Sequence, residues 1–239
     1  MTNIVILVIR SICLRFSSYG AANLNLNAQP AARALFPVGT GQVDPADKSA
    51  RILKAALDLF IRYGIKRTSI DDIAREAGIA KGTLYLYYRS KDALFAAVAE
   101  RMCAERLAMA REASAGAGPL VDRLVAILDS QIGVMCRLVA ESPHLAELAE
   151  AHASAAAIYG KFDRDIEALI NEVLLGHGIS GRNVPEMLTA CAIGMVEICG
   201  TDEKLFCERL TALVDTLIRG LRSKMEVTQE TELPKPRGV

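Results

Sequence analysis

Apolar residues recur at intervals of three and four from residue 47 to about residue 223, a spacing that is typical of amphipathic helices. The pattern predicts helices over about 47–63, 70–77, 81–88, 91–114, 119–141, 143–151, 153–176, 184–199 and 203–223. No segment alternates convincingly between apolar and polar residues in the manner of a strand. The predicted fold class is therefore all-α.

Capping residues fix several of these helix ends. Gly64 follows the first helix and Gly78 the second, where a residue with positive φ commonly ends a helix. Ser69 precedes the second helix with Asp72 three residues later, a pair that resembles a capping box. Ser90 is placed to cap the long fourth helix.

The two ends of the chain differ from this helical region. Residues 1–45 are rich in Ala, Asn, Gly and Pro after a short apolar run, and we interpret them as a disordered extension or as the product of a start codon assigned too early. A secretory signal fits less well, because Arg10 interrupts the apolar run and no basic residue precedes it. Residues 224–239 are polar and are expected to form a flexible tail.

Charge is distributed unevenly although the whole chain has a formal net charge of zero. Residues 46–106 carry 12 basic and 8 acidic side chains, whereas residues 107–239 carry 13 basic and 19 acidic ones. Only the first of these regions is therefore suited to meet a polyanion.

Composition narrows the class of protein further. The 6 cysteines are scattered without a CxxC pair, which favours reduced thiols and a cytoplasmic location. The longest unbroken apolar run is far shorter than the roughly 20 residues of a membrane span, so no membrane partner is expected. The 3 histidines leave few general bases, and no catalytic spacing is present, so we expect neither an enzyme nor a cofactor.

The most informative segment is Thr68–Tyr88, T-S-I-D-D-I-A-R-E-A-G-I-A-K-G-T-L-Y-L-Y-Y. Two short helices joined by a glycine-containing turn form a helix-turn-helix (69–88), whose second helix can enter the major groove of DNA. An ordinary helical hairpin with a solvated lysine would share some of these features. The motif therefore indicates DNA binding without proving it.

A longer stretch resembles one family. R-I-L-x-A-A-L-x-L-F-x-x-x-G, followed by T-S-x-D-D-I-A-x-E-A-G-I-A-K-G-T-L-Y-L-Y-Y-x-S-K-D-A-L-F, resembles the DNA-binding domain of TetR-family transcriptional regulators over about residues 49–95. The resemblance implies a three-helix DNA-binding domain over 46–95, a helical effector-binding and dimerisation domain over 96–223, and a homodimer on an inverted-repeat operator.

The same resemblance assigns DNA-contacting positions within this sequence. Thr68 and Ser69 lie where the family contacts phosphate, Tyr85 matches a groove-facing tyrosine, and Tyr87 and Lys91 match phosphate contacts. The full set is Thr68, Ser69, Lys81, Gly82, Thr83, Tyr85, Tyr87 and Lys91. For Lys81, contact with a base, contact with a phosphate and exposure to solvent all remain open.

Two residues depart from the family pattern. Ala80 stands where Ser or Thr often caps the recognition helix, so a cap worth about 0.5–2 kcal/mol is expected to be missing. Leu86 replaces a frequent tyrosine, which removes a hydroxyl contact and leaves an apolar group in its place.

The C-terminal region gives weaker signals. Polar or polarisable residues on its helices are candidates for lining an effector pocket: Gln131, Met135, Tyr159, Asn171 and Glu197. A metal site at His144, Glu147 and His152 is not favoured, because no second ligand cluster accompanies them.

Helices 184–199 and 203–223 are expected to form the homodimer interface. The apolar residues assigned to that interface are Leu188, Met195, Val196, Leu210, Leu213, Val214, Leu217 and Leu221.

Three hypotheses follow for function. The first is a ligand-responsive transcriptional repressor that a small, hydrophobic effector releases from double-stranded DNA. The second is an architectural or nucleoid DNA-binding protein without an effector. A helical enzyme is the third and has the least support.

Overall fold

The computed structural model describes residues 47–134, 137, 153–181, 183–199 and 202–231. Every regular element within these ranges is helical, and they contain no strand. In chain order the elements are α3 (Lys48–Tyr63), α4 (Ile70–Glu76), α5 (Lys81–Tyr87), α6 (Lys91–Ala115), α7 (Leu120–Leu128), the π-helical turn η1 (Asp129–Gly133), α10 (Ala153–Leu175), α11 (Val184–Cys199) and α12 (Glu203–Thr231).

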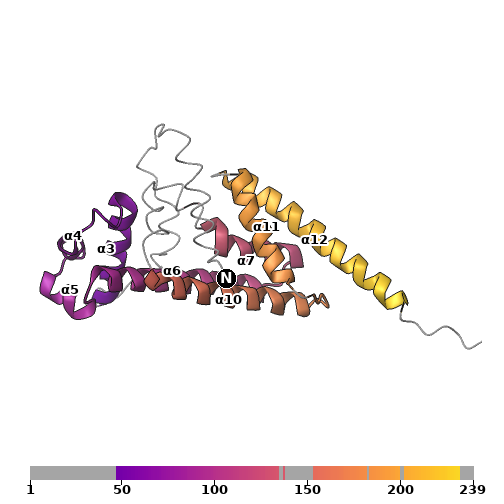
Figure 1. The fold of residues 1–239 in the computed structure, drawn as a ribbon, viewed down its shortest axis with the longest axis horizontal. Coiled ribbons are helices and arrows are strands. Elements are labelled where there is room, and N and C mark those ends of the chain that lie inside the picture. The colour runs from indigo at the N-terminus through magenta and orange to yellow at the C-terminus, as the bar shows by residue number, and fades with distance from the viewer. Residues whose placement is uncertain (1–46, 135–136, 138–152, 182, 200–201, 232–239) are drawn as a thin grey trace, which may run out of the picture.

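Helices α3, α4 and α5 form a small head at one end of the molecule (Figure 1). Their core closes around Phe60, Ile73 and Leu84, all inaccessible to solvent. Phe95 at the start of α6 packs edge-on against Phe60, with ring centroids 6.2 Å apart. Because α6 leaves the head and continues along the long axis of the molecule, it joins the head to the remaining helices (Figure 1).

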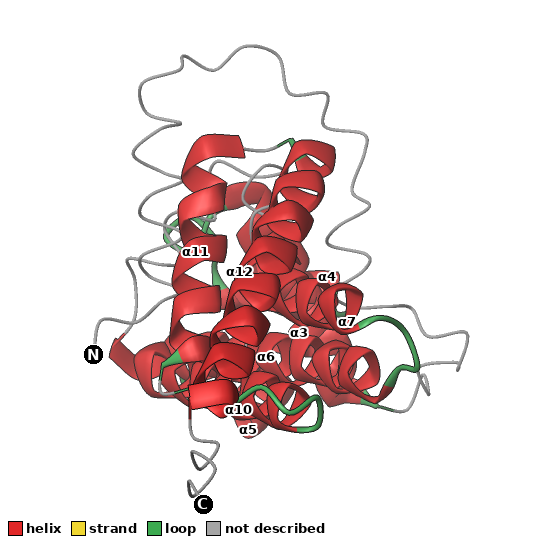
Figure 2. Ribbon diagram, turned by 90° about the vertical axis from the view of Figure 1, so that its right-hand side faces the viewer, coloured by secondary structure: helices red, strands yellow, loops and turns green. Residues whose placement is uncertain are grey.

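The C-terminal helices pack around α6. Helix α10 lies along α6, and α7 packs on both, while α11 and α12 stand side by side at the far end of the molecule (Figures 1 and 2). Ile127, Ile166 and Leu188 are among the fully buried residues of this second core. The predicted boundary between 46–95 and 96–223 falls inside α6, which belongs to both cores.

A π-helical turn interrupts the predicted helix 119–141. Regular α-helix gives way to η1 after Leu128 and resumes at Val134, and the predicted end at 141 lies outside the described residues. Arg106 inserts there and binds the carbonyls of Ser130 and Gln131, and an inserted side chain of this kind disturbs helical geometry.

The last helix continues to Thr231 instead of ending at 223, so the predicted tail 224–239 starts too early. Residues 224–231 contain neither Gly nor Pro and allow the helix to propagate. The extension 1–45, the predicted helix 143–151 and the candidate metal ligands His144, Glu147 and His152 lie outside the described residues.

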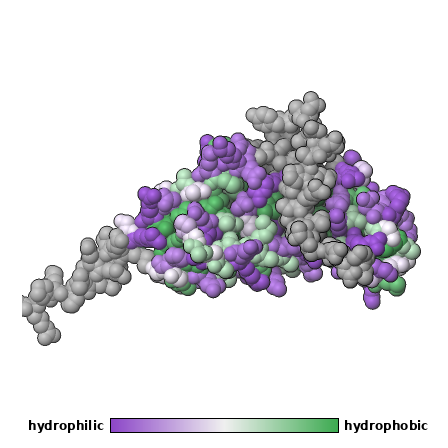
Figure 3. Space-filling view, turned by 180° about the vertical axis from the view of Figure 1, so that it is seen from behind, coloured by the Kyte–Doolittle hydropathy of each residue, from purple (hydrophilic) through white to green (hydrophobic). Residues whose placement is uncertain are grey.

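Apolar surface is unevenly distributed. The face turned away from the viewer of Figure 1 carries most of its apolar area over the C-terminal helices, whereas the head is mainly hydrophilic (Figure 3). Across the described ranges, none of the helices has the length and apolar character that a bilayer crossing requires.

Candidate nucleic-acid interface

The turn between α4 and α5 is fixed by backbone conformation and by one arginine. Gly78 has φ +64°, a backbone conformation that residues other than glycine rarely adopt. A Cβ at this position would lie 2.9 Å from Nη2 of Arg51. That nitrogen donates to the Ala77 carbonyl at 2.6 Å, which ties the turn to α3. The angle between α4 and α5 is therefore set by contacts inside the head.

Capping follows the sequence-based predictions at both short helices. The Ser69 hydroxyl accepts from the Asp72 amide at 3.1 Å while the Asp72 carboxylate accepts from the Ser69 amide at 3.2 Å, which completes the capping box. Helix α5 begins after Ala80 without a side-chain cap, as expected. Hydrogen bonds from Ser69 lower the pKa of the Asp72 carboxyl below its ordinary value.

Helix α5 turns one face inward and leaves the opposite face open. Leu84 is its buried anchor, and successive residues rotate by about 100°, so Gly82 and Leu86 lie on the outermost line of the helix. Leu86 is 84% exposed, and a Cβ built on Gly82 would meet no atom within 4 Å.

Hydrogen-bonding side chains flank this outermost line of α5. Lys81 and Tyr85 lie on one side of it, and Thr83 and Tyr87 on the other. Tyr85 and Tyr87 are 43% and 47% exposed. The side chains assigned to the recognition helix are therefore presented together on one outward surface.

Lys81 has a partner that the sequence did not reveal. Its Nζ lies 2.9 Å from Oδ2 of Asp71, and the two side chains are 54% and 59% exposed. The hydrogen bond to Asp71 raises the pKa of the Lys81 ammonium above its ordinary value. Lys81 therefore forms an exposed ion pair in the absence of DNA, and its three alternatives stay open. The contact crosses the turn between helices, where no helical spacing could indicate it.

The Thr68 side chain is buried within the head. It is only 3% exposed, and its hydroxyl donates to the Gly64 carbonyl at 2.8 Å. The Thr68 hydroxyl therefore closes the turn after α3, and a phosphate contact by this residue stays a prediction.

Lys91 and Ser69 also have internal partners. The Lys91 ammonium donates to the carbonyls of Ile65 at 2.9 Å and Thr68 at 3.3 Å. The Ser69 hydroxyl donates to Asp72 at 2.5 Å. Lys91 therefore holds the turn before α4 against α6, a role that its family position did not indicate.

The residues assigned to the effector pocket differ in their burial. Gln131 and Tyr159 are buried, whereas Asn171 is exposed on α10 and borders neither described cavity, so we do not retain it. Met135 and the side chain of Glu197 lie outside the described residues. Burial raises the pKa of the Tyr159 hydroxyl well above its ordinary value.

A buried polar network occupies the centre of the C-terminal core. Gln131 donates from Nε2 to Asp163 at 3.2 Å and accepts from Thr189 at 3.4 Å. Arg106 is inaccessible to solvent, donates to the Ser130 carbonyl at 2.9 Å and stacks on the Phe162 ring at 4.5 Å. Sequence reasoning missed Arg106, since a single arginine on a helix is usually solvated.

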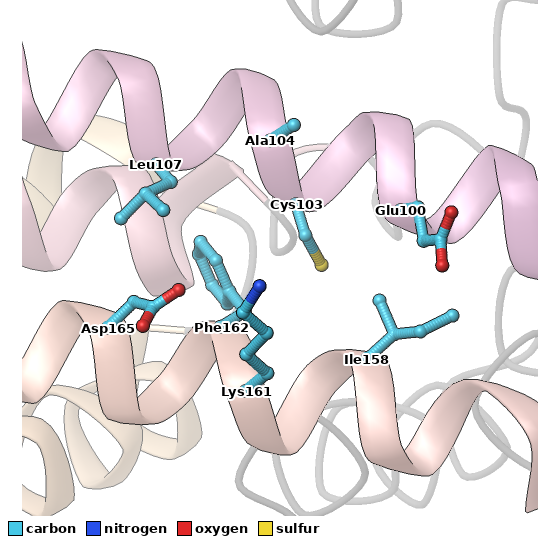
Figure 4. Close-up of a pocket in the computed structure, with 8 residues that line it drawn as sticks. All are labelled: Glu100, Cys103, Ala104, Leu107, Ile158, Lys161, Phe162 and Asp165. Carbon is cyan, nitrogen blue, oxygen red and sulfur yellow. The ribbon is translucent and has the colours of Figure 1, made fainter.

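A cleft of about 260 Å³ opens between α6 and α10 (Figure 4). Figure 4 shows the Cys103 side chain projecting from α6 towards α10, whose Phe162 and Lys161 border the same space. Burial raises the pKa of the Cys103 thiol to about 11, so this cysteine is protonated at neutral pH. Within the described ranges, no group of three or more acidic, Cys or His side chains could hold a metal.

The apolar residues assigned to dimerisation divide into two sets. Leu188, Val196, Leu210 and Val214 are at most 2% exposed and belong to the core of their own subunit, so their assignment to an interface is wrong. Met195, Leu213, Leu217 and Leu221 are partly buried. The outer face of α11 instead carries Met187, Ala190, Cys191, Gly194 and Ile198, with Met187 and Ile198 about half exposed.

Comparisons with known proteins agree with this arrangement. The chain is 30% identical to the HTH-type transcriptional regulator RutR of Escherichia coli over 143 residues, which cover 58% of this chain and 65% of RutR. It is 47% identical to the HTH-type transcriptional repressor SCO4008 of Streptomyces coelicolor over 58 residues, 24% of this chain and 30% of the repressor. The chain thus spans less than two thirds of the length of the curated relatives it matches.

A crystal structure of a transcriptional regulator from Pseudomonas aeruginosa shares the fold, with a TM-score of 0.59 at 18% identity over 78% of this chain and 96% of that one. The sequence profile described as "Bacterial regulatory proteins, tetR family" matches residues 52–98, which run from α3 into α6. The head therefore matches the tetR family of bacterial regulatory proteins over residues 52–98, and the helical C-terminal core shares its fold with a solved transcriptional regulator.

Proposed function

We propose that the chain is a transcriptional repressor that binds duplex DNA in the cytoplasm by inserting α5 into the major groove. The observation that carries this proposal is the open outer line of α5, where the space above Gly82 is empty and allows a close approach. The matched family model describes regulatory proteins, which favours this proposal over an enzyme or an architectural protein.

The contacts divide into two kinds. Lys81, Gly82, Thr83 and Tyr85 face the groove, and Ser69 and Tyr87 lie towards phosphates on either side. Ten basic and six acidic residues over 47–95 favour a polyanion. Lys91 supports this surface from behind through its bonds to the turn before α4.

Selection from a randomised duplex pool with the full chain tests the proposal. We expect an inverted repeat whose half-site centres lie one or more helical turns apart, with affinity that falls steeply as salt rises. Enrichment of no sequence, or retention of DNA that is insensitive to salt, would contradict it.

We further propose a homodimer formed through α11 and α12. The outer face of α11 supplies small and apolar residues, among them Ala190 and Gly194, which let two helices approach closely. Analytical ultracentrifugation at micromolar concentration should show a dimer, and Ala190→Glu should convert it to a monomer of unchanged helical content. A wild-type monomer would refute the interface.

A small effector is proposed to act through α6. This helix carries the cleft residues Glu100, Cys103 and Leu107 and continues into the head. An effector shifts the protein away from DNA only if it binds the DNA-free conformation more tightly. Small hydrophobic compounds that raise the melting temperature should also release the selected duplex. If every stabilising compound leaves DNA binding unchanged, an effector-controlled repressor is excluded.

A further inference from the structure

Leu86 stands out among the exposed apolar side chains of the described residues. It is 84% exposed, whereas the other large apolar side chains on the surface range from 40% to 57%. A solitary exposed leucine is common on proteins and needs no explanation by itself. Its position on α5 is what makes it informative.

Leu86 and Gly82 are one helical turn apart on the outermost line of α5, opposite the buried Leu84. Any surface that α5 approaches closely enough to use the space at Gly82 therefore also meets Leu86. The neighbouring Lys81, Tyr85 and Tyr87 can donate hydrogen bonds around it, but Leu86 itself has none to offer.

The floor of the major groove is polar except at one kind of group. Base edges present nitrogen and oxygen donors and acceptors, and the only apolar group is the 5-methyl of thymine. A leucine pressed against polar edges would leave them without partners, at a cost in affinity. Against a methyl group, the same leucine removes apolar surface from water on both sides.

We propose that Leu86 reads the 5-methyl group of a thymine in each half-site of the operator. This inference rests on the proposed function and adds a specificity-determining residue to it. The basic charge of the head and the donors that flank Leu86 favour a DNA groove over an apolar protein surface as the occupant.

The experiment uses the duplex selected from the randomised pool by the full chain. Each thymine is replaced in turn by deoxyuridine, symmetrically in both half-sites, so that only a methyl group is lost. Fluorescence anisotropy measures the affinity of the wild type, of Leu86→Ala, and of Met109→Ala as a control with an exposed apolar residue on α6.

At one thymine, deoxyuridine should weaken the wild type and Met109→Ala by about fourfold per half-site, the loss expected for one buried methyl group. Leu86→Ala should bind the thymine duplex about as weakly as the wild type binds the uracil one, and should not respond to that replacement. Thermal melting checks that Leu86→Ala stays folded, as its exposure predicts.

Two outcomes overturn the inference and leave the proposed function in place. One is a selected duplex on which the wild type tolerates deoxyuridine at every position. The other is a wild type that loses affinity at one thymine while Leu86→Ala loses it equally there, which would assign the methyl contact to another residue. Failure to select any duplex would overturn both the proposed function and this inference.

Discussion

Replacing Arg106 with methionine tests the polar centre of the C-terminal core. The change removes the guanidinium that donates to the carbonyls of Ser130 and Gln131 and stacks on Phe162. Methionine fills much of the same volume but donates no hydrogen bond. Two carbonyls of η1 then lose the donor on which this widened turn depends.

The expected loss can be worked from these contacts. A hydrogen bond to a charged group contributes about 1.5–3 kcal/mol, and a desolvated cation–π contact about 2 kcal/mol. Relief from burying the charge offsets part of this, so Arg106→Met should lower the free energy of unfolding by about 3–5 kcal/mol. Arg106→Lys should recover little of this stability, because an ammonium lacks the planar array of N–H donors with which the guanidinium reaches both carbonyls.

Urea denaturation followed by circular dichroism measures the loss. Arg219→Met is the control for loss of an arginine, since Arg219 is exposed on α12 and pairs with Asp215 one turn away. That control should cost about 0.5 kcal/mol or less. If Arg106→Met unfolded within about 1 kcal/mol of the wild type, the network would not stabilise the core and the reasoning would be wrong.

Three further changes test the head. Ser69→Ala removes the cap of α4 and should lower the free energy of unfolding by about 1 kcal/mol in urea denaturation. Because the pKa of Asp72 is lowered in the folded protein, this loss of stability should be full at neutral pH and shrink as the pH falls below 3.8. A loss that does not change with pH would contradict the capping box. Asp71→Asn breaks the ion pair of Lys81 and removes a negative charge, so affinity for random duplex DNA should rise several-fold in anisotropy titrations. Weaker binding would show that Asp71 holds Lys81 in the orientation that contacts DNA. Lys91→Gln loses two hydrogen bonds to carbonyls and should lower the free energy of unfolding by about 2 kcal/mol. The slope of log affinity against log salt concentration should fall by less than roughly 1 per half-site. Unchanged stability with a decrease of roughly 1 in this slope would identify Lys91 as a phosphate contact.

Local signals in the sequence predicted the head well. Ser69, Asp72 and Ser90 cap helices within three residues of themselves, and Gly64 and Gly78 both adopt positive φ. Each of these signals acts over one turn of chain. The helix bounds of the head therefore differ from the prediction by no more than one residue.

Contacts between distant residues could not be read in the same way. Lys81 with Asp71, Lys91 with Ile65, and Arg106 with η1 join residues 10 to 26 positions apart, and no helical periodicity relates them. The apolar pattern of α11 and α12 likewise shows which residues are apolar, but not which side faces the subunit's own core. This explains why Leu188 and Leu210 were assigned to an interface.

Gly82→Leu on the selected duplex tests the central claim most directly. Nothing lies within 4 Å of a Cβ at Gly82, and leucine favours helix by about 1 kcal/mol over glycine, so the variant should unfold at the same or higher urea concentration than the wild type. If α5 lies in the major groove, the added side chain must hold the helix away from the bases, and affinity should fall by at least about tenfold. A Gly82→Leu variant that binds the selected duplex as tightly as the wild type would show that α5 does not enter the groove.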